Sequence, residues 1–600
     1  MRRIGQLALV LLGLCTGPEA RAARDLTTVN VVVNQAGYLP ADQKIALVET
    51  NRDLIGAGAV ARVLAQPGGT PALPDLPVAV DRRRYGNFRH QYVVDFSALS
   101  ALGTYVIEIR DGSDALIATS PPTAVAADPW SPLLALDLRF FGVQRSGNMA
   151  PLIHAPSHLD DGVAVGGSDD GLPVDLAGGW YDAGDYIKFS LTIAYASFMQ
   201  LFALRELAPA DLDPSLRAAI RSEARIGLAY LLKAHPTPTA FYFQVADARD
   251  HDVPFRLPED DTAYGGPRPA YYGLGANTAG KAAAALALGA IEWAGDDPTF
   301  AAACRTAAEE VYALGKAIAD GTSTDPKHAL LVSCVETPAE YAANRLNCDF
   351  YNEDSWLDDM TVGAIELYEV TATAQYLTDA VAFGAQLEAA YASLGLLNLH
   401  DEAFYKLYPH LPASGTFSQA DVLAQLQIDA DRVRKRAAQD RYNAGQKRFL
   451  WGSAADMSGD AVTCLLVSKL TGDPVCRQTA HWQLDFLLGR NPFGVSLLAG
   501  AGAVYPLHPH HQVATLLPAA WYAPGSVIGS LAGGLARKSQ YPFRSDPDLK
   551  TAVLGDTTSP FAPFENNRFQ YHDIREDYVS NEPSLDANSN LLAAVLGMME

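Results

Sequence analysis

The stretch TAGKAAAALALGAIEWAG, at residues 278–295, decides the fold class. It is rich in alanine and leucine, and its apolar residues cover almost the whole circumference of a helix. A helix that is apolar on nearly every side is buried on nearly every side. This segment therefore predicts an inner helix that is covered by an outer layer of helices.

Related segments follow one another from about residue 128 onward. Apolar residues recur there at intervals of three and four, and several segments begin at Asp, Ser or Thr, as helices do. Examples are YIKFSLTIAYASFMQLFALREL (186–207), GDAVTCLLVSKLTG (459–472) and SNLLAAVLGMM (589–599). We predict that residues 128–600 form one mainly α domain, built as a closed double ring of helices. Its long connections at 235–277 and 491–585 are the kind of loops that carry function.

The region before residue 128 has a different pattern. VNVVVNQAGY (29–38), HQYVVDF (90–96) and GTYVIEI (103–109) are short apolar runs separated by turn residues. Short strands at regular intervals are typical of a β-sandwich. We expect residues 23–127 to form a small β-sandwich that supports the larger domain, with direct ligand binding as the alternative.

Residues 1–22 have the features of a cleavable export signal. They combine Arg2 and Arg3, the apolar run LALVLLGLCTG (7–17) and the step Ala20-Arg21-Ala22. A lipid anchor at Cys15 is the alternative, but Leu14 stands where a small residue is expected. We therefore expect a secreted or periplasmic protein.

The net charge limits the possible partners, and the cysteines indicate a disulfide. The formal net charge of −23 makes nucleic acid and anionic membranes poor partners. Cys334 and Cys348 flank a short polar loop, and they are the pair that we expect to form a disulfide. Removing the signal leaves an odd number of cysteines, so at least one thiol stays free.

Three carboxylates stand in unusual surroundings. GGWYDAGDYIKF (178–189) places Asp182 and Asp185 among aromatic residues, and DYVSNEPSLDANSN (577–590) places Glu582 in an Asn-rich loop. A polar turn and a solvated helix cap are the ordinary interpretations. Hydrolysis of a glycosidic bond, however, needs one carboxylic acid for the leaving oxygen and one carboxylate for water or carbon. Aromatic rings nearby offer apolar faces to sugars.

The segment HPHHQ (508–512) contains three histidines. A metal site is one interpretation, but acidic or sulfur partners at short ligand spacing are missing, so hydrogen bonding to a polar ligand is favoured. No contiguous calcium-binding loop of the EF-hand type is present either.

These motifs together resemble glycoside hydrolase family nine, the inverting cellulases with an (α/α)6 barrel. The resemblance rests on the two carboxylate motifs, on LGRNPFGVSLLAG (488–500) with HPHHQ, and on LRFFGVQRSG (138–147). VNQAGYLPADQKIALVE (33–49) resembles the start of the immunoglobulin-like domain that precedes many of these barrels. The resemblance covers essentially the whole chain after residue 22.

The resemblance implies a role for each matching residue. Asp185 matches the base that activates water, Asp182 the neighbour that helps to hold this water, and Glu582 the general acid. The expected substrate-binding residues are His251, Trp356, His510, Gln512, Tyr578 and Asn581, with Tyr578 and Asn581 also supporting Glu582. Many relatives carry structural calcium, but the reaction itself requires no cofactor.

Departures from the family pattern concern the substrate. Gln512 replaces the arginine of a His-x-Arg motif, and Ala499 replaces a hydroxyl residue. The resemblance implies hydrolysis of β-1,4-glucan by a monomeric O-glycosyl hydrolase, in the manner of endo-β-1,4-glucanases. The first alternative is an exo-acting β-glucosaminidase or β-glucosidase on short oligosaccharides. The second is a carbohydrate-binding protein that has lost catalysis.

Overall fold

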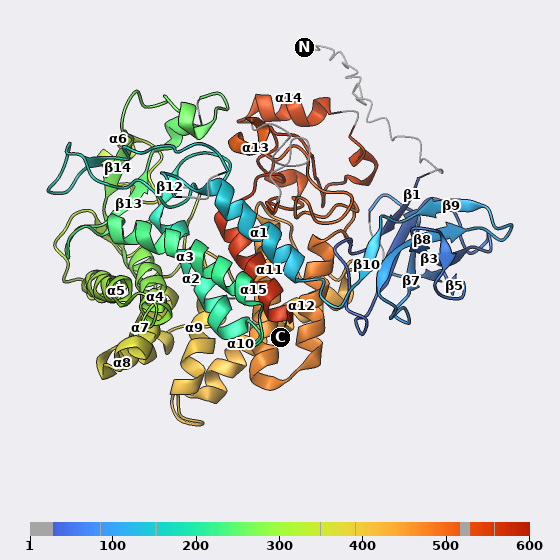
Figure 1. Cartoon of the computed structure of the whole chain (residues 1–600), viewed down its shortest axis with the longest axis horizontal. Helices are drawn as coiled ribbons and strands as arrows, with labels where there is room; N and C mark the ends of the chain where they lie inside the picture. The colour runs from blue at the N-terminus through green and yellow to red at the C-terminus, as the bar shows by residue number, and fades with distance from the viewer. Residues whose placement is uncertain are drawn as a thin grey trace, which may run out of the picture.

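The computed structural model describes residues 28–83, 86–149, 153–251, 253–348, 350–390, 392–516, 529–556 and 559–599. The expected export signal, residues 1–22, lies outside this range. The described chain has a strand-rich part and a larger helical part that lie side by side (Figure 1). None of the described helices is long and apolar enough to cross a membrane.

The strand-rich part consists of two facing antiparallel sheets. One has the order β1-β2-β7-β6, and the other has the order β10-β8-β3-β4, with β5 on β3 and β9 on β8. Alternating apolar residues such as Val48, Val94 and Ile107 are fully buried between them. The strands are β1 (Val29–Val32), β2 (Ile45–Thr50), β3 (Val60–Gln66), β4 (Thr70–Pro71), β5 (Leu76–Pro77), β6 (Ala79–Val80), β7 (His90–Asp95), β8 (Gly103–Arg110), β9 (Leu116–Thr119) and β10 (Thr123–Val125).

The helical part begins at α1 and forms two rings. Its inner helices are α2 (Ser190–Phe202), α4 (Ala276–Glu292), α7 (Leu357–Thr371), α9 (His400–Leu407), α11 (Ser453–Thr471) and α15 (Leu585–Met599). Each contacts the next, and α15 returns to α2, which closes the ring. In α4, every residue from Ala276 to Ala290 is buried, as expected from its sequence.

An outer helix covers each step of the inner ring. α3 packs on α2, α5 on α4, α8 on α7, α10 on α9 and α11, α12 on α11, and α1 on α15. The outer helices are α1 (Ser131–Gln144), α3 (Pro214–Ala234), α5 (Pro298–Ala319), α8 (Ala374–Gly384), α10 (Gln419–Gln439) and α12 (Pro474–Leu487). The remaining helices, α6 (Pro338–Ala342), α13 (Gln512–Leu516) and α14 (Pro547–Gly555), lie in the connections. The double ring predicted from the sequence is confirmed.

The connections also contain strands that the helical periodicity did not predict. A four-stranded sheet has the order β11-β14-β13-β12. Its strands are β11 (Val163–Val165), β12 (Lys188–Phe189), β13 (Tyr242–Val245) and β14 (Pro269–Tyr272); β15 (Leu274–Gly275) pairs with β16 (His328–Ala329). Lys188 lies opposite Val245 in this sheet, so the sheet joins the segment after Asp185 to the segment before His251.

A buried arginine connects the two parts of the molecule. Arg441 follows α10, and its guanidinium donates to the carbonyl oxygens of Val48 (2.9 Å) and Tyr92 (3.2 Å) in the β-sandwich. It also lies 3.4 Å from Glu49 and 3.1 Å from Asp81. The sandwich is therefore docked on the barrel through paired, buried charges.

The cysteines agree with the expectation. Cys334 and Cys348 form a disulfide. Cys304, Cys464 and Cys476 are buried free thiols.

Candidate active site

Closure of the inner ring brings the distant carboxylates together. The GGWYDAGDYIKF turn precedes inner helix α2, Glu582 precedes inner helix α15, and these two helices are neighbours. The backbone N–H of Gly184 donates to Oε1 of Glu582 at 3.1 Å. The N–H of Leu585, at the start of α15, donates to the carbonyl oxygen of Asp182 at 3.0 Å. The three carboxylates thus share one site, although about four hundred residues separate them along the chain.

Gly184 is essential to this approach. A Cβ atom at this position would lie 2.3 Å from the carbonyl oxygen of His510 and 3.1 Å from Oε1 of Glu582. The carbonyl oxygen of Gly184 in turn accepts from the N–H of Gln512 at 2.9 Å. Only a residue without a side chain lets these three segments meet.

Asp182 is buried in the turn that precedes α2. Its Oδ2 accepts a hydrogen bond from the hydroxyl of Tyr351. Its Oδ1 is buried and has no hydrogen-bond partner in the described part of the chain. Burial raises the pKa of Asp182 to about 7 against the effect of the Tyr351 hydroxyl. The unpaired oxygen is suited to accept a hydrogen bond from a bound water molecule.

The surroundings of Asp185 lower its pKa, whereas those of Asp182 raise it. Its Oδ1 accepts from the N–H of Ile187 at 2.8 Å, and its Oδ2 pairs with Nε2 of His251 at 2.6 Å. Burial alone would raise the pKa of Asp185, but the hydrogen bond and charge of His251 outweigh it, and the pKa lies below its usual range. Asp185 is therefore ionised where its neighbour is still partly protonated.

Glu582 is the protonated member of the set. Burial, followed by the negative charge of Asp185, raises its pKa from 4.5 to about 8. A carboxyl that keeps its proton at neutral pH beside an ionised carboxylate is the combination that acid and base catalysis of glycoside hydrolysis requires.

Two other predicted residues border the carboxylates. Nδ1 of His510 lies 2.5 Å from the carbonyl oxygen of Arg575, and its ring contacts Phe255 and Tyr578 edge-on. Gln512 is buried, and its Oε1 accepts from the backbone N–H and from the guanidinium of Arg256, both at 3.3 Å. A guanidinium therefore lies beside Gln512, which replaces the arginine of the family motif, but this guanidinium belongs to Arg256 in another loop.

Tyr578 and Asn581 act on the loop rather than directly on Glu582. The hydroxyl of Tyr578 donates to Asp546 at 2.9 Å. Asn581 is fully buried, and its amide donates to the carbonyl oxygen of His508 at 2.8 Å. The amide of Asn581 therefore holds the histidine segment beside Glu582.

Trp356 is the predicted residue with the most ordinary surroundings. It lies at the start of α7, is half-buried against the main core, and packs edge-on against Phe383 of α8 at 5.4 Å between ring centroids. These contacts are those of a packing residue, so the structure gives Trp356 no direct connection to the carboxylates.

Several residues of the site were missed by the sequence analysis. Tyr351 contacts Asp182, and Arg256 braces the loop that carries His251 by pairing with Asp250 at 2.5 Å. Two exposed aromatic residues lie beside predicted ones: Phe350 next to His251 (5.8 Å) and Trp451 next to Tyr578 (5.2 Å). Phe350 and Trp451 are 44% and 46% exposed, which suits stacking against a sugar. The aromatic residue in WGSAADM (451–457) was the available signal for Trp451.

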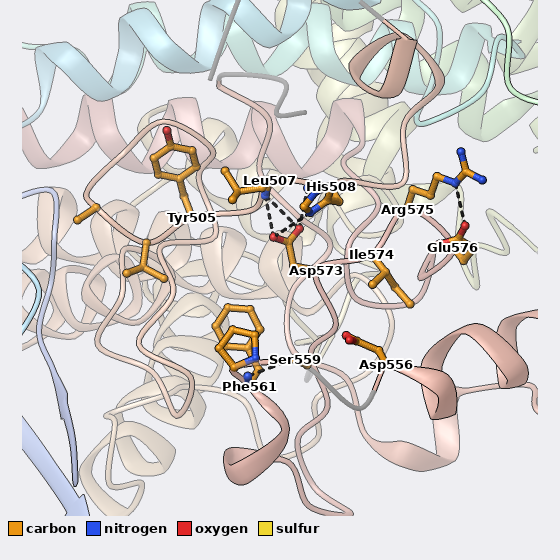
Figure 2. A pocket seen from close by; sticks show the side chains of 13 residues that line it. Tyr505, Leu507, His508, Asp556, Ser559, Phe561, Asp573, Ile574, Arg575 and Glu576 are labelled. Carbon is orange, nitrogen blue, oxygen red and sulfur yellow. Dashed lines mark hydrogen bonds and ion pairs between the residues drawn. The ribbon is translucent and has the colours of Figure 1, made fainter. Parts of the chain in front are cut away.

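A cavity of about 740 Å³ lies behind the histidine segment (Figure 2). Its wall includes Tyr505, His508, Phe561, Asp573 and Arg575. Asp573 accepts from the backbone N–H groups of Leu507 and His508, as Figure 2 shows. None of Asp182, Asp185 and Glu582 lines this cavity, so it is distinct from the carboxylate cluster.

The three histidines have separate surroundings. His511 is buried and pairs with Gln144 at 2.7 Å, whereas the side chain of His508 is exposed. In the described part of the chain, no group of three or more His, Cys, Asp and Glu side chains is arranged to hold a metal ion.

Comparison with known proteins identifies the family. The profile described as Glycosyl hydrolase family 9 matches residues 130–595. The chain belongs to this family. The profile described as Cellulase N-terminal ig-like domain matches residues 27–113, in agreement with the β-sandwich.

Curated relatives of this family 9 protein are distant in sequence. It is 27% identical over 509 residues to Endoglucanase B of Cellulomonas fimi, covering 80% of this chain but 43% of that protein. It is also 27% identical over 516 residues to Endoglucanase 19 of Oryza sativa subsp. japonica, covering 79% of this chain and 90% of that protein. The chain thus spans less than half of the first relative and most of the second.

Solved structures agree in fold. A metagenome-derived glycoside hydrolase family 9 endoglucanase superimposes with a TM-score of 0.76 at 24% identity, covering 96% of this chain and 100% of that chain. A family 9 protein of Bacteroides ovatus superimposes with a TM-score of 0.71 at 21% identity, covering 95% and 98%. The expected barrel with a preceding immunoglobulin-like domain is therefore confirmed.

Proposed function

We propose that the protein is an exported, inverting β-glycoside hydrolase that cleaves β-1,4-glucan. The observation that carries this proposal is the meeting of three carboxyls at one turn: the N–H of Gly184, between Asp182 and Asp185, donates to Glu582 at 3.1 Å. The lowered pKa of Asp185 and the raised pKa of Glu582 agree with a base and an acid. The proposed substrate class is taken from the endoglucanase names of the relatives from Cellulomonas fimi and Oryza sativa subsp. japonica. The enzyme acts as a monomer, and its carboxyls and one water molecule suffice for the reaction.

The reaction follows from the roles of the three carboxyls. Asp185 removes a proton from a water molecule that also donates to the unpaired Oδ1 of Asp182. The water oxygen attacks the anomeric carbon as the glycosidic bond breaks, and Glu582 gives its proton to the leaving oxygen. The product keeps the oxygen of water on the face opposite to the original bond.

Proton NMR of fresh products tests this mechanism. Cellopentaose is mixed with the enzyme, and the anomeric signals are recorded before mutarotation. The α-anomer is expected first; initial release of the β-anomer would exclude inversion. Binding without any release of reducing sugar would instead favour the binding protein that lacks catalysis.

A second substrate class has support from the acidic residues below the turn. Asp456 lies in the first turn of α11 and Asp586 in that of α15. Burial raises the pKa of both carboxyls, to about 7 for Asp456, and the charge of Asp586 adds to the rise at Asp182. An ammonium group bound beside these carboxyls would favour their ionised form and pair with it, which is the chemistry that a glucosamine-containing oligosaccharide offers.

Chain-length analysis separates the two substrates. Cellopentaose and chitosan pentamer are offered at equal concentration, and the products are resolved by size. Faster cleavage of cellopentaose at internal bonds supports an endoglucanase. Stepwise removal of single units from the chitosan pentamer supports an exo-acting glucosaminidase.

A further inference from the structure

The cavity in Figure 2 has no role in the reaction proposed above. Its volume of about 740 Å³ falls within the range of about 300–1,000 Å³ that is usual for ligand sites. Its lining comes mainly from two segments, residues 503–508 and 573–576, together with Phe561 and its neighbours. Gly184, which joins the catalytic turn to Glu582, does not line it, so the cavity needs an explanation of its own.

Apolar side chains form one wall of the cavity. Val504 and Leu507 are 36% and 38% exposed although they are apolar, and Tyr505 between them is half-buried. Phe561 is buried and packs edge-on against Tyr571, with 5.2 Å between ring centroids. Exposed apolar groups in a concave surface favour a ligand with an apolar face, and a tyrosine ring is a surface on which a sugar can stack.

Four polar side chains of the lining are already paired. Nε of Arg575 donates to Oε1 of Glu576 at 2.8 Å, and Figure 2 shows the two side chains turned toward each other. Asp573 accepts from the backbone N–H groups of Leu507 (2.9 Å) and His508 (2.8 Å), and its Oδ2 lies 3.6 Å from Nδ1 of His508. Because these groups have partners, they favour a neutral ligand whose hydroxyl groups both donate and accept hydrogen bonds.

A β-1,4-linked glucan combines both properties. Its pyranose rings are neutral, carry hydroxyl groups around the edge and present C–H groups on their faces. The apolar wall suits the faces of the rings, and the paired polar groups suit the edge. A strongly charged ligand, by contrast, would have to compete with the pairs that Arg575 and Asp573 already form.

The cavity adjoins the catalytic site through one segment, residues 508–512. His508 lines the cavity, whereas the carbonyl oxygen of His510 packs against Gly184. The N–H of His510 also donates to the carbonyl oxygen of Asn581 at 3.0 Å, directly before Glu582. A ligand in the cavity would therefore lie beside the catalytic site without touching its carboxylates.

We propose that this cavity is a second carbohydrate-binding site, which holds a neutral β-1,4-linked oligosaccharide against Tyr505 and Leu507. The choice of ligand rests on the proposed function. A glucan chain held there stays close to the catalytic site, so the cavity raises the local concentration of substrate and takes no part in bond cleavage.

The number of binding sites tests the inference. Calorimetric titration of the Glu582→Gln enzyme with cellopentaose measures binding without hydrolysis, and two sites per chain are expected. When Tyr505→Ala and Leu507→Ser are added, the affinity of one site is expected to fall about tenfold or more, while the other site is unchanged. Equal affinity of the second site for maltopentaose, whose rings are α-linked, would overturn the choice of a β-linked ligand.

Leu172→Ser is the matched control, because Leu172 is 56% exposed and does not line the cavity. It is expected to keep both sites. In the otherwise unchanged enzyme, Tyr505→Ala/Leu507→Ser is expected to leave kcat and KM for cellotriose unchanged and to raise KM for hydroxyethyl cellulose about threefold or more. Thermal unfolding checks that each variant keeps its fold.

Three results would overturn the second site: a single site in Glu582→Gln, two sites that Tyr505→Ala/Leu507→Ser leaves unchanged, or a lower kcat on cellotriose in the folded double variant. The last result would make the cavity part of the catalytic cleft. Failure of the proposed function would look different, because the Glu582→Gln enzyme would then release reducing sugar from cellopentaose during the titration.

Discussion

The interface between the two parts of the molecule and the catalytic site both bury charges, but they do so in opposite ways. At the interface, the guanidinium of Arg441 lies between Glu49 and Asp81 and also binds two backbone carbonyls. In the site, Asp182 is buried and Glu582 is half-buried next to another carboxylate, and His251 is the cation that directly contacts Asp185.

The difference shows how burial serves two purposes. Opposite charges that meet in a buried place hold two surfaces in one register, and breaking such a pair is costly. Carboxyls that crowd together acquire different pKa values, which is unfavourable for stability but necessary for proton transfer. Substitutions at the two places should therefore change different quantities.

The largest expected effect is that of Glu582→Gln on turnover. Glutamine cannot protonate the leaving oxygen, so kcat on unactivated cellooligosaccharides should fall about 10³-fold or more. The measurement is reducing-sugar release under saturating substrate. Glu576→Gln, an exposed substitution in the same loop, is the control and should retain activity. Near-normal turnover of Glu582→Gln would contradict the expectation that substitutions in the site change turnover while those at the interface change stability.

Arg441→Met should act on stability instead. It leaves Glu49 and Asp81 buried without their cation, which should lower the free energy of unfolding by about 3–5 kcal/mol. Denaturant unfolding measures the loss, and Arg448→Met, at an exposed position, is the control. The turnover of the folded variant should stay close to normal; a large loss of kcat would show that the interface also shapes the site.

Gly184→Ala tests whether the site depends on close approach of three segments. The added methyl would meet the carbonyl oxygen of His510 at 2.3 Å and displace the turn from Glu582. A displacement of this size should reduce kcat about 10²-fold. Gly266→Ala, where a Cβ meets nothing within 4 Å, should be neutral. Equal activity of both variants would contradict the geometric argument.

The smallest expected effect is a gain of stability in Glu582→Gln at alkaline pH. The folded state holds the proton of Glu582 up to about pH 8, whereas the unfolded chain releases it near pH 4.5. Stability is therefore lost as pH rises from about 4.5 to about 8. Glutamine removes this dependence and should stabilise the protein by about 1–3 kcal/mol at pH 8. Unfolding curves at pH 5 and pH 8 measure the difference, and equal shifts at both values would contradict it.

The sequence predicts the architecture well because the spacing of apolar residues indicates which faces of a helix are buried. The Ala-rich segment at 278–295 shows that α4 is an inner helix, and the loop between Cys334 and Cys348 indicates the disulfide. The four-stranded sheet was missed because β12 has only two residues and adjoins helix α2 directly. Such a short strand has no recognisable alternation.

Contacts between particular side chains were harder to predict from the sequence than the fold. The motifs of family 9 indicated Asp182, Asp185 and Glu582, yet no pattern in the sequence indicates that His251 pairs with Asp185 or Arg441 with Glu49. These partners come from different loops, and their distances are set by the packing of the whole barrel. For the same reason, the burial of Asn581 and the packing of Trp356 became visible only in the structure.

The hydrogen bond from the N–H of Leu585 to Asp182 links barrel closure to chemistry. Helix α15 completes the inner ring, and the residues just before it bring Glu582 to the turn. A folding molecule whose last inner helix has not yet docked has no acid beside its base. Such incomplete barrels would be catalytically silent, so activity reports the completed fold.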